Sequence, residues 1–287
     1  MTSLRLHDVL AVLERMFPAD TAQSWDRVGL VTGNLDQPVR RVHAAVDPTL
    51  EVIEEARAAG ADLLITHHPL LLRGVHSVAT TSAKGAAVTS LVVGDVALYV
   101  AHTNADVAEP GVNTALARAC GLTSTEPLSI EENRAMGRVG DLAEETDLAS
   151  FARRLGEALP TAPGGIRVSG PADGRVRRVA LLGGAGDGLI EAARAADADV
   201  YVTSDLRHHP VLEAREESRG GAPFLVDAGH WATESLWLED LLTRLRNSLA
   251  DAGADMVGWE THVSTIRTDP WSFTVGAQTA PGGPSEG

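Results

Sequence analysis

The order of hydrophobic and polar residues along the chain predicts alternating strands and helices. Short runs rich in valine, isoleucine and leucine are typical of buried strands, and we expect strands at 42–46, 62–66, 97–101, 178–182, 200–203 and 224–227. Alanine-rich stretches, and stretches with apolar residues every three or four positions, predict helices at 4–17, 50–59, 113–120, 148–158, 189–196 and 233–251. This alternation is typical of an α/β fold with mainly parallel sheets.

An internal repeat adds a second level of order. Residues 56–66 and 193–203 align with an offset of 137 residues, and seven of the eleven positions are identical. Alanine-rich helices often match by chance, but each copy follows a predicted strand and precedes a polar loop that contains histidine. We therefore expect two related α/β halves, 1–127 and 128–279, and a disordered tail at 280–287. Whether the halves exchange edge strands stays open at this point.

Composition narrows the class of protein. The chain has 287 residues, 24 of them basic and 39 acidic, a net charge of −15 and one cysteine. Nucleic acid is not an expected partner, because binding its phosphates takes clustered lysine and arginine. A single thiol forms neither an intrachain disulfide nor a thiolate zinc cluster, so we expect a cytoplasmic protein whose metals are held by nitrogen and oxygen. No apolar stretch predicts a membrane span or a signal peptide.

Three clusters that contain histidine follow predicted strands. They are His67-His68-Pro69 after 62–66, His102 and Asp106 after 97–101, and His230 and Glu234 after 224–227. Parallel strands place their functional loops at one sheet edge, and a spacing of four residues puts two ligands on one helix face. Each cluster also has an ordinary explanation, because histidines can hydrogen-bond in turns and Thr233 is a good N-cap. Three such clusters together favour a metal site.

A fourth motif, Trp-Asp-Arg-Val-Gly-Leu at 25–30, completes a resemblance to the GTP cyclohydrolase 1 type 2 homologues, or Nif-three-like proteins. The likeness runs from Trp25 to Phe273 and corresponds to the short form of the family. It implies a Nif-three-like fold, a homohexamer, and two divalent ions with Glu234 as a bridging ligand. The implied ligands are His67, His68, Asp106, His230 and Glu234. The family's usual Trp-Asp-Asn is Trp-Asp-Arg here, which leaves the role of Arg27 open.

The ligand chemistry leads to a functional hypothesis. Five nitrogen and oxygen ligands leave open positions on two ions, and this donor set suits zinc, manganese or iron. We expect a hydrolase in which activated water attacks a small molecule, and the resemblance implies a nucleotide, GTP. His102 is a candidate auxiliary ligand, proton shuttle or hydrogen-bonding neighbour, and Asp205 and His208 are candidate substrate contacts or general acids. A regulatory metal-binding protein without turnover has the same ligands.

Other features offer competing interpretations. Glycines at 183, 184, 186 and 188 lie between a strand and a helix, where backbone amides can bind phosphate, but their spacing departs from the dinucleotide fingerprint. A dinucleotide oxidoreductase is therefore the weaker alternative. His43 and His262 have no clustered partner in the sequence and are expected to be surface or packing residues. Candidate interface anchors, which core packing explains equally well, are Trp231, Trp237 and Trp259.

Overall fold

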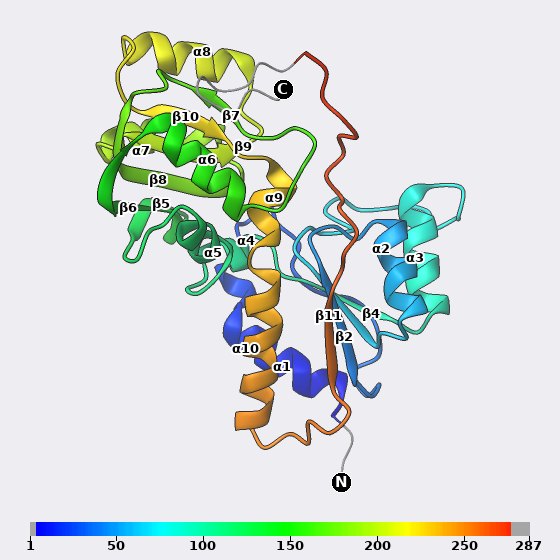
Figure 1. Cartoon of the computed structure of the whole chain (residues 1–287). Coiled ribbons are helices and arrows are strands. Elements are labelled where there is room, and N and C mark those ends of the chain that lie inside the picture. The colour runs from blue at the N-terminus through cyan, green and yellow to red at the C-terminus, as the bar shows by residue number, and fades with distance from the viewer. Residues whose placement is uncertain (1–3, 277–287) are drawn as a thin grey trace, which may run out of the picture. The chain divides into compact units, whose positions relative to one another are not determined.

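The computed structural model describes residues 4–276, which form two α/β units (Figure 1). Within the described residues, unit 1 consists of 4–111 together with Trp237–Thr268, and unit 2 consists of Val112–Leu236 and 269–276. The α/β class expected from the sequence is confirmed. The boundary at Gly111 lies before the expected one at 127, and the chain later returns to unit 1 because its last long helix and last strand pack there.

Unit 1 contains a five-stranded sheet in the order β1-β4-β3-β2-β11. The strands are β1 (Gly29–Thr32), β2 (Arg41–Ala45), β3 (Leu63–Thr66), β4 (Ala97–Val100) and β11 (Glu260–Val263). All neighbours run parallel except β1, which pairs antiparallel with β4 at one edge. At the other edge β11 pairs with β2, so the second half of the sequence contributes a strand to the first sheet.

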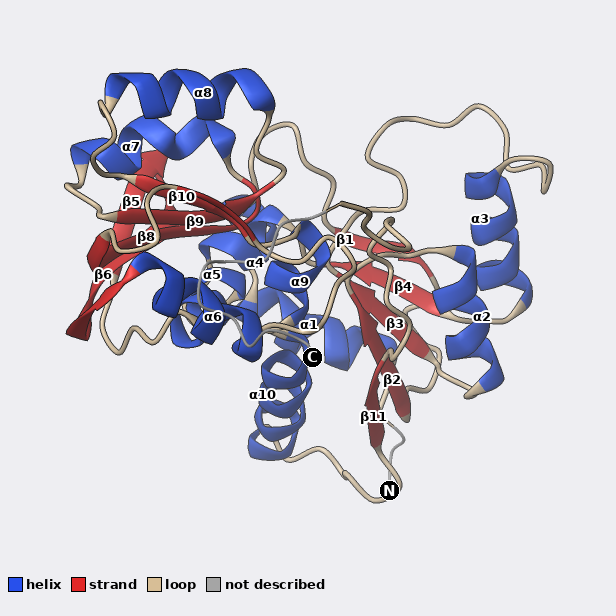
Figure 2. Cartoon of the chain, turned by 45° about the horizontal axis from the view of Figure 1, so that its top comes forward, coloured by secondary structure: helices blue, strands red, loops and turns tan. Residues whose placement is uncertain are grey.

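Helices cover both faces of this sheet (Figures 1 and 2). α2 (Leu50–Ala58) and α3 (Ala83–Val93) lie on one face, and α1 (Leu6–Met16) and α10 (Leu238–Asp251) lie on the other. The turn η1 (Ala19–Thr21) and the short helix α4 (Thr103–Val107) complete the unit. α10 buries the leucines whose spacing predicted a helix: Leu238, Leu241, Leu242, Leu245 and Leu249.

The single helix expected at 233–251 is two helices in the structure. α9 (His230–Ser235) belongs to unit 2 and α10 to unit 1, so the prediction of one continuous helix was wrong. The break falls at Trp237, whose ring is buried in unit 1 and meets Phe17 edge-on at a centroid distance of 5.4 Å. Hydrophobic periodicity continues through this residue, which is why the pattern did not reveal the break.

Unit 2 contains a six-stranded sheet in the order β5-β6-β8-β9-β10-β7. The strands are β5 (Glu126–Glu131), β6 (Arg134–Asp147), β7 (Arg167–Ser169), β8 (Arg175–Ala185), β9 (Val200–Ser204) and β10 (Phe224–Asp227). The three central strands, β8, β9 and β10, are parallel, and the strands outside them pair antiparallel. Each unit therefore has a parallel centre, as expected; unit 1 has one antiparallel strand at one edge, and unit 2 has antiparallel strands at both edges.

Helices also lie on both faces of the second sheet (Figure 2). One face carries α5 (Val112–Ala119), α6 (Leu148–Ala158) and α9, and the other carries α7 (Ile190–Ala195), which follows the turn η2 (Asp187–Leu189), and α8 (His208–Glu217). A continuous core fills the first side and includes Leu116, Phe151, Leu155, Val179 and Val202. Burial of these apolar side chains is what fixes α9, and with it the candidate ligands it carries, on the sheet.

The internal repeat is present in the hydrogen bonding of both units. Gly60 and Asp197 occupy equivalent positions after α2 and α7, and both have positive φ, +67° and +53°. Two residues later, Asp62 and Asp199 each accept two backbone N–H groups from the neighbouring strand, at 2.7 to 2.9 Å. The donors are Arg40 and Arg41 in unit 1 and Arg177 and Arg178 in unit 2.

Several remaining sequence predictions can be compared with the described residues. Trp237 and Trp259 are buried in unit 1, and Trp231 packs against the core of unit 2, so core packing explains these tryptophans. None of the helices within residues 4–276 combines the length and apolar character needed to cross a bilayer. The expected disordered tail at 280–287 lies outside the described residues.

Candidate metal centre

The first histidine cluster lies where β3 and β4 end in unit 1. Beyond the last residue of β3, the chain continues alongside the end of β2, and the backbone N–H groups of His67 and His68 donate to the carbonyls of Ala45 and Val46 at 3.2 and 2.8 Å. His67 is completely buried and His68 is half-buried. Backbone hydrogen bonds to the end of β2 therefore fix the main chain of both histidines, independently of their side chains.

The imidazole rings of both histidines are oriented through Nδ1. His67 Nδ1 lies 2.9 Å from the carbonyl oxygen of Ala101, and His68 Nδ1 lies 2.7 Å from Asp47 Oδ1. Metal-binding histidines are commonly held in this way, because an acceptor at one nitrogen fixes the tautomer and directs the other toward the metal. His67 Nε2 faces Asp106 Oδ1 at 3.7 Å.

His102 joins this cluster from the residue just before α4. Its ring centroid lies 5.1 Å from that of His67 and 5.4 Å from that of His68, and one ring nitrogen from each of the three lies within 4.8 Å of the others. Asp26 Oδ1 accepts a hydrogen bond from His102 Nδ1 at 2.9 Å. The third histidine is thus oriented as the first two are.

Asp26 is ionised despite its burial. Desolvation alone would raise the pKa of this carboxyl, but hydrogen bonds from His102 and Thr103 outweigh it and hold the pKa well below its usual range. The Thr103 hydroxyl and backbone N–H donate to Asp26 Oδ2 at 2.6 and 3.0 Å. Asp26 therefore fixes His102 and the start of α4 together. Arg27 does not share this role, because its guanidinium donates to the carbonyls of Trp25 and Asp26 in its own loop.

The second cluster lies in unit 2, where β10 ends and α9 begins. Gly229 turns the chain with φ of +84°, His230 starts the helix, and Glu234 follows one turn later on the same face. His230 Nε2 lies 3.1 Å from Glu234 Oε2, and Glu234 is 3% exposed. His230 Nδ1 lies 2.8 Å from Asp205 Oδ2, so this fourth histidine is also held at Nδ1 by an acceptor.

The glycine-rich segment lies beside Glu234. Gly184 has φ of +70°, and a Cβ at this position would lie 2.1 Å from Glu234 Oε1. The N–H groups of Gly183 and Gly184 donate to Asn113 Oδ1 and Thr233 Oγ1, and that of Gly186 donates to the carbonyl of Ser204. These N–H groups already donate to acceptors inside unit 2, which disfavours the interpretation of this segment as a phosphate-binding loop. The glycines instead allow the close approach of the glutamate.

The other candidates from the sequence have different positions. His208 is the first residue of α8, is exposed, and makes a ring contact with His209 at 5.1 Å. Asp205 supports His230 through the hydrogen bond above, a role that sequence reasoning did not assign. A general-acid role for His208 stays a prediction.

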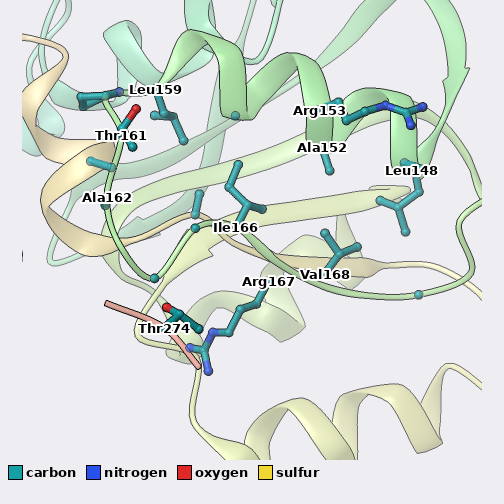
Figure 3. Close-up of a pocket in the computed structure, with 18 of the residues that line it drawn as sticks. Leu148, Ala152, Arg153, Leu159, Thr161, Ala162, Ile166, Arg167, Val168 and Thr274 are labelled. Carbon is teal, nitrogen blue, oxygen red and sulfur yellow. The ribbon is translucent and has the colours of Figure 1, made fainter. Parts of the chain in front are cut away.

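A cavity of about 830 Å³ in unit 2 is separate from these ligands (Figure 3). It lies between α6 and the segment before β7, and its lining is mostly apolar, with Arg153 and Arg167 among the polar residues. Ala232 of α9 contributes to this lining, whereas His230 and Glu234 are not part of it.

Sequence reasoning did not assign the role of the carboxylates that support the histidines, and it missed one further cluster. Asp47 and Asp205 each follow a buried strand by one or two residues, and that position was the available signal. The expectation that His43 and His262 have no clustered partner was wrong. Pairing of β11 with β2 brings them together beside Glu55, and no local sequence pattern shows that pairing.

The donor set fits divalent metal ions. Imidazole nitrogens with carboxylate oxygens are typical ligands of zinc, manganese and iron, and the supporting acceptors at Nδ1 are the usual surroundings of such ligands. The single thiol, Cys120, is buried in the core of unit 2 and is not part of either cluster.

Comparisons with known proteins agree with the resemblance seen in the sequence. The family profile described as Duf34/NIF3 (NGG1p interacting factor 3) matches residues 4–270. A GTP cyclohydrolase 1 type 2 homolog from Streptomyces coelicolor is 46% identical over 278 residues, 94% of this chain and 95% of the relative. A relative of the same name from Mycobacterium tuberculosis is 33% identical and covers 94% of this chain and 97% of its own length.

Solved structures show the same fold. A Bacillus cereus protein related to NIF3 superposes with a TM-score of 0.85 at 26% identity, over 96% of this chain and all of that one. A Staphylococcus aureus hypothetical protein gives 0.85 at 28% identity, over 95% and 100%. The chain belongs to the Duf34/NIF3 family.

Proposed function

We propose that this protein is a divalent-metal-dependent hydrolase of a small molecule, and that His67, His68 and Asp106 in unit 1 and His230 and Glu234 in unit 2 would hold two divalent ions. One observation carries the proposal: each of the three histidines among these ligands has an acceptor at Nδ1, a backbone carbonyl or an aspartate carboxylate. An acceptor at one ring nitrogen is the usual support of a metal-binding histidine. Zinc, manganese and iron all suit these donors.

The residues around such ions would have different roles. The ions would supply activation of water and stabilisation of negative charge. His67, His68 and His230 are held in one orientation by their Nδ1 partners. His102, with Nδ1 bonded to the ionised Asp26, is oriented to act through Nε2, either as an additional ligand or as a group that holds a proton close to the substrate.

The proposed substrate is a nucleotide, and GTP is the first to test. The names of the relatives support this choice. The family resemblance implies ring-opening hydrolysis of GTP with release of formate. The chain carries a net charge of −15, which repels anions, so divalent ions would provide the local positive charge that attracts the phosphates.

Metal analysis followed by a nucleotide screen tests the proposal. Protein purified without chelator should contain close to two ions per chain at these ligands, and the metal-loaded protein should release formate or phosphate from a nucleotide. His67→Ala should lose the activity and the ions held by these ligands, whereas His76→Ala, in an exposed loop, should keep both. Absence of metal that added zinc, manganese or iron cannot restore would refute the site. Metal binding without turnover of any nucleotide would favour a regulatory metal-binding protein instead.

Assembly and location belong to the same proposal. Family resemblance supports a homohexamer, and the exposed apolar side chains of Trp271, Phe273 and Val275, at alternate positions of one segment, are available for contacts between copies. Sedimentation at micromolar concentration tests this, and a monomer would contradict it. A cytoplasmic location stays a prediction from the single cysteine.

A further inference from the structure

A second group of metal-ligand side chains lies in unit 1, away from the strand ends that carry the first. His43 on β2, Glu55 on α2 and His262 on β11 each place one ligand atom within 4.8 Å of the other two. His43 and His262 are register partners on adjacent parallel strands, so their side chains lie on the same face of the sheet. α2 lies on that side of the sheet (Figure 1), and its Glu55 is hydrogen-bonded to His43.

The distances within this group match two ligands on one ion. His43 Nε2 lies 2.9 Å from Glu55 Oε2. In a tetrahedral zinc site with bonds of about 2.0–2.1 Å, neighbouring ligand atoms are roughly 3.3 Å apart, so a shift of a few tenths of an ångström would admit the ion. The two imidazole rings have centroids 4.6 Å apart and are tilted by 44°, so they are not stacked face to face.

The surroundings of Glu55 resemble the outer support of a metal ligand. The Ser264 hydroxyl donates to Glu55 Oε2, and the Thr265 N–H and hydroxyl both lie 3.4 Å from Oε1. Each carboxylate oxygen has two lone pairs, so Oε2 can keep the serine hydrogen bond and bind an ion where it now faces His43. The carboxylate is thereby held in position before an ion arrives.

We propose that His43, Glu55 and His262 form a separate zinc site, with water in the fourth position. Two imidazoles and one carboxylate with an open position are a common zinc environment. His43 is buried and His262 is exposed, so an ion can enter from the solvent side at His262. The bound ion would link the last strand, β11, to β2 and α2. None of these residues belongs to the hydrolase site proposed above.

The ligand contributed by β11 provides the first test. The full-length protein is stripped with chelator, dialysed against buffered zinc, and its zinc counted per chain by elemental analysis. His262→Ala should bind one ion fewer than the wild type, because the affinity of this site falls by more than about 100-fold on loss of a ligand. Glu55→Gln should lose the same ion while keeping the hydrogen bond from Ser264. His76→Ala, an exposed histidine in a loop, is the matched control and should bind as many ions as the wild type.

A second measurement separates this site from the first cluster. In His67→Ala protein, added zinc should still raise the melting temperature, and adding His262→Ala should abolish that rise. If His262→Ala and Glu55→Gln bind as much zinc as the wild type, and the zinc-dependent melting of His67→Ala persists in the double variant, the group is only a structural hydrogen-bond network and the proposal fails. Neither result depends on enzymatic activity.

Discussion

The repeated helix–strand segments of the two units end in different chemistry. In unit 1, β3 leads directly into His67 and His68, whose side chains are candidate ligands. In unit 2 the equivalent strand, β9, ends in Ser204 and continues into Asp205, which supports the candidate ligand His230 from outside. The duplication kept the scaffold in both units. It did not keep the role of the residues at the strand end.

The two units already differ in the hydrogen bond made by a threonine that both copies of the repeat contain. Thr66 and Thr203 are completely buried at equivalent positions of the repeat. The Thr66 hydroxyl donates to the carbonyl of His68 at 2.9 Å and shapes the histidine loop. The Thr203 hydroxyl donates to the carbonyl of Gly184 at 3.0 Å and connects β9 to the strand beside Glu234. The equivalent threonine thus stabilises the loop that carries the candidate ligands in unit 1, and the strand that lies beside the candidate ligand Glu234 in unit 2.

The largest expected difference lies between the histidine pair after β3, His67-His68, and the pair after β9, His208-His209. His67→Ala should weaken metal binding by more than about 100-fold, because loss of a ligand exceeds the 10–100-fold cost of losing its support. His208→Ala, at the start of α8, should leave the metal content unchanged. Elemental analysis of both variants checks this, and a comparable loss of metal in His208→Ala would contradict the contrast between the strand ends.

Gly184 is expected to be sensitive to substitution because it lies beside the candidate ligand Glu234 in unit 2. Gly184→Ala combines strain at φ +70° with a Cβ 2.1 Å from Glu234 Oε1, so the carboxylate must move. We expect the metal affinity to fall by roughly 10-fold or more, by analogy with disturbed ligand support. Gly188→Ala is the control, since no atom lies within 4 Å of its added Cβ. Equal metal titrations for the two variants would show that Glu234 tolerates displacement.

The supporting aspartates give a direct comparison of the two clusters. Asp47→Asn and Asp205→Asn retain shape and remove the charge next to His68 and His230, so each should weaken metal binding by about 10–100-fold. Asparagine tolerates the positive φ of residue 205, +53°, so the backbone should be preserved. Isothermal titration with zinc measures the effect, with the exposed Asp251→Asn as control. An effect in one unit alone would show that only that cluster binds metal under the conditions used.

The repeated aspartates should affect stability equally. Asp62→Ala and Asp199→Ala each remove a carboxylate oxygen that accepts two backbone N–H groups, so each should lower the free energy of unfolding by about 1.5–3 kcal/mol. Urea denaturation followed by circular dichroism checks this. A large loss in one variant only would mean that the two copies no longer contribute equally to stability.

The smallest effect concerns Cys120, which reports on unit 2 alone. Burial raises the pKa of its thiol to about 12, so the thiol stays protonated at pH 8 and should react slowly with a thiol reagent until unit 2 opens. Because the folded pKa exceeds the ordinary value of 9.0, the free energy of unfolding should decline as the pH rises above about 9. Labelling rates at several urea concentrations measure the opening, and fast labelling of folded protein would contradict this burial.

The sequence predicted the central strands, most long helices and the clustered histidines, because each depends on a local pattern. An apolar run predicted β3, the leucine periodicity predicted α10 but not its separation from α9, and the strand-end rule led to His67, His102 and His230. Long-range pairing is outside such patterns. The attachment of β11 to β2, and with it the meeting of His43 and His262, depends on contacts between residues more than 200 positions apart.

The supporting role of the aspartates was missed for a related reason. Asp47 and Asp205 are recognisable only by the histidine that each one holds, and those partners lie 21 and 25 residues away. Asp26 was part of a quoted motif, but its partner His102 lies 76 residues away. Sequence alone identifies candidate ligands more easily than the groups that orient them.

The return of the chain to unit 1 has a consequence for synthesis on the ribosome. Most of unit 2 is translated before α10 and β11 emerge from the ribosome. Until then, the edge of β2 in the sheet of unit 1 is unpaired and the sheet face that α10 covers is exposed. An unpaired strand edge next to exposed apolar surface is where incomplete chains associate with one another or with chaperones. Residues 237–268 therefore complete the folding of a unit whose first residues were made more than 200 codons earlier.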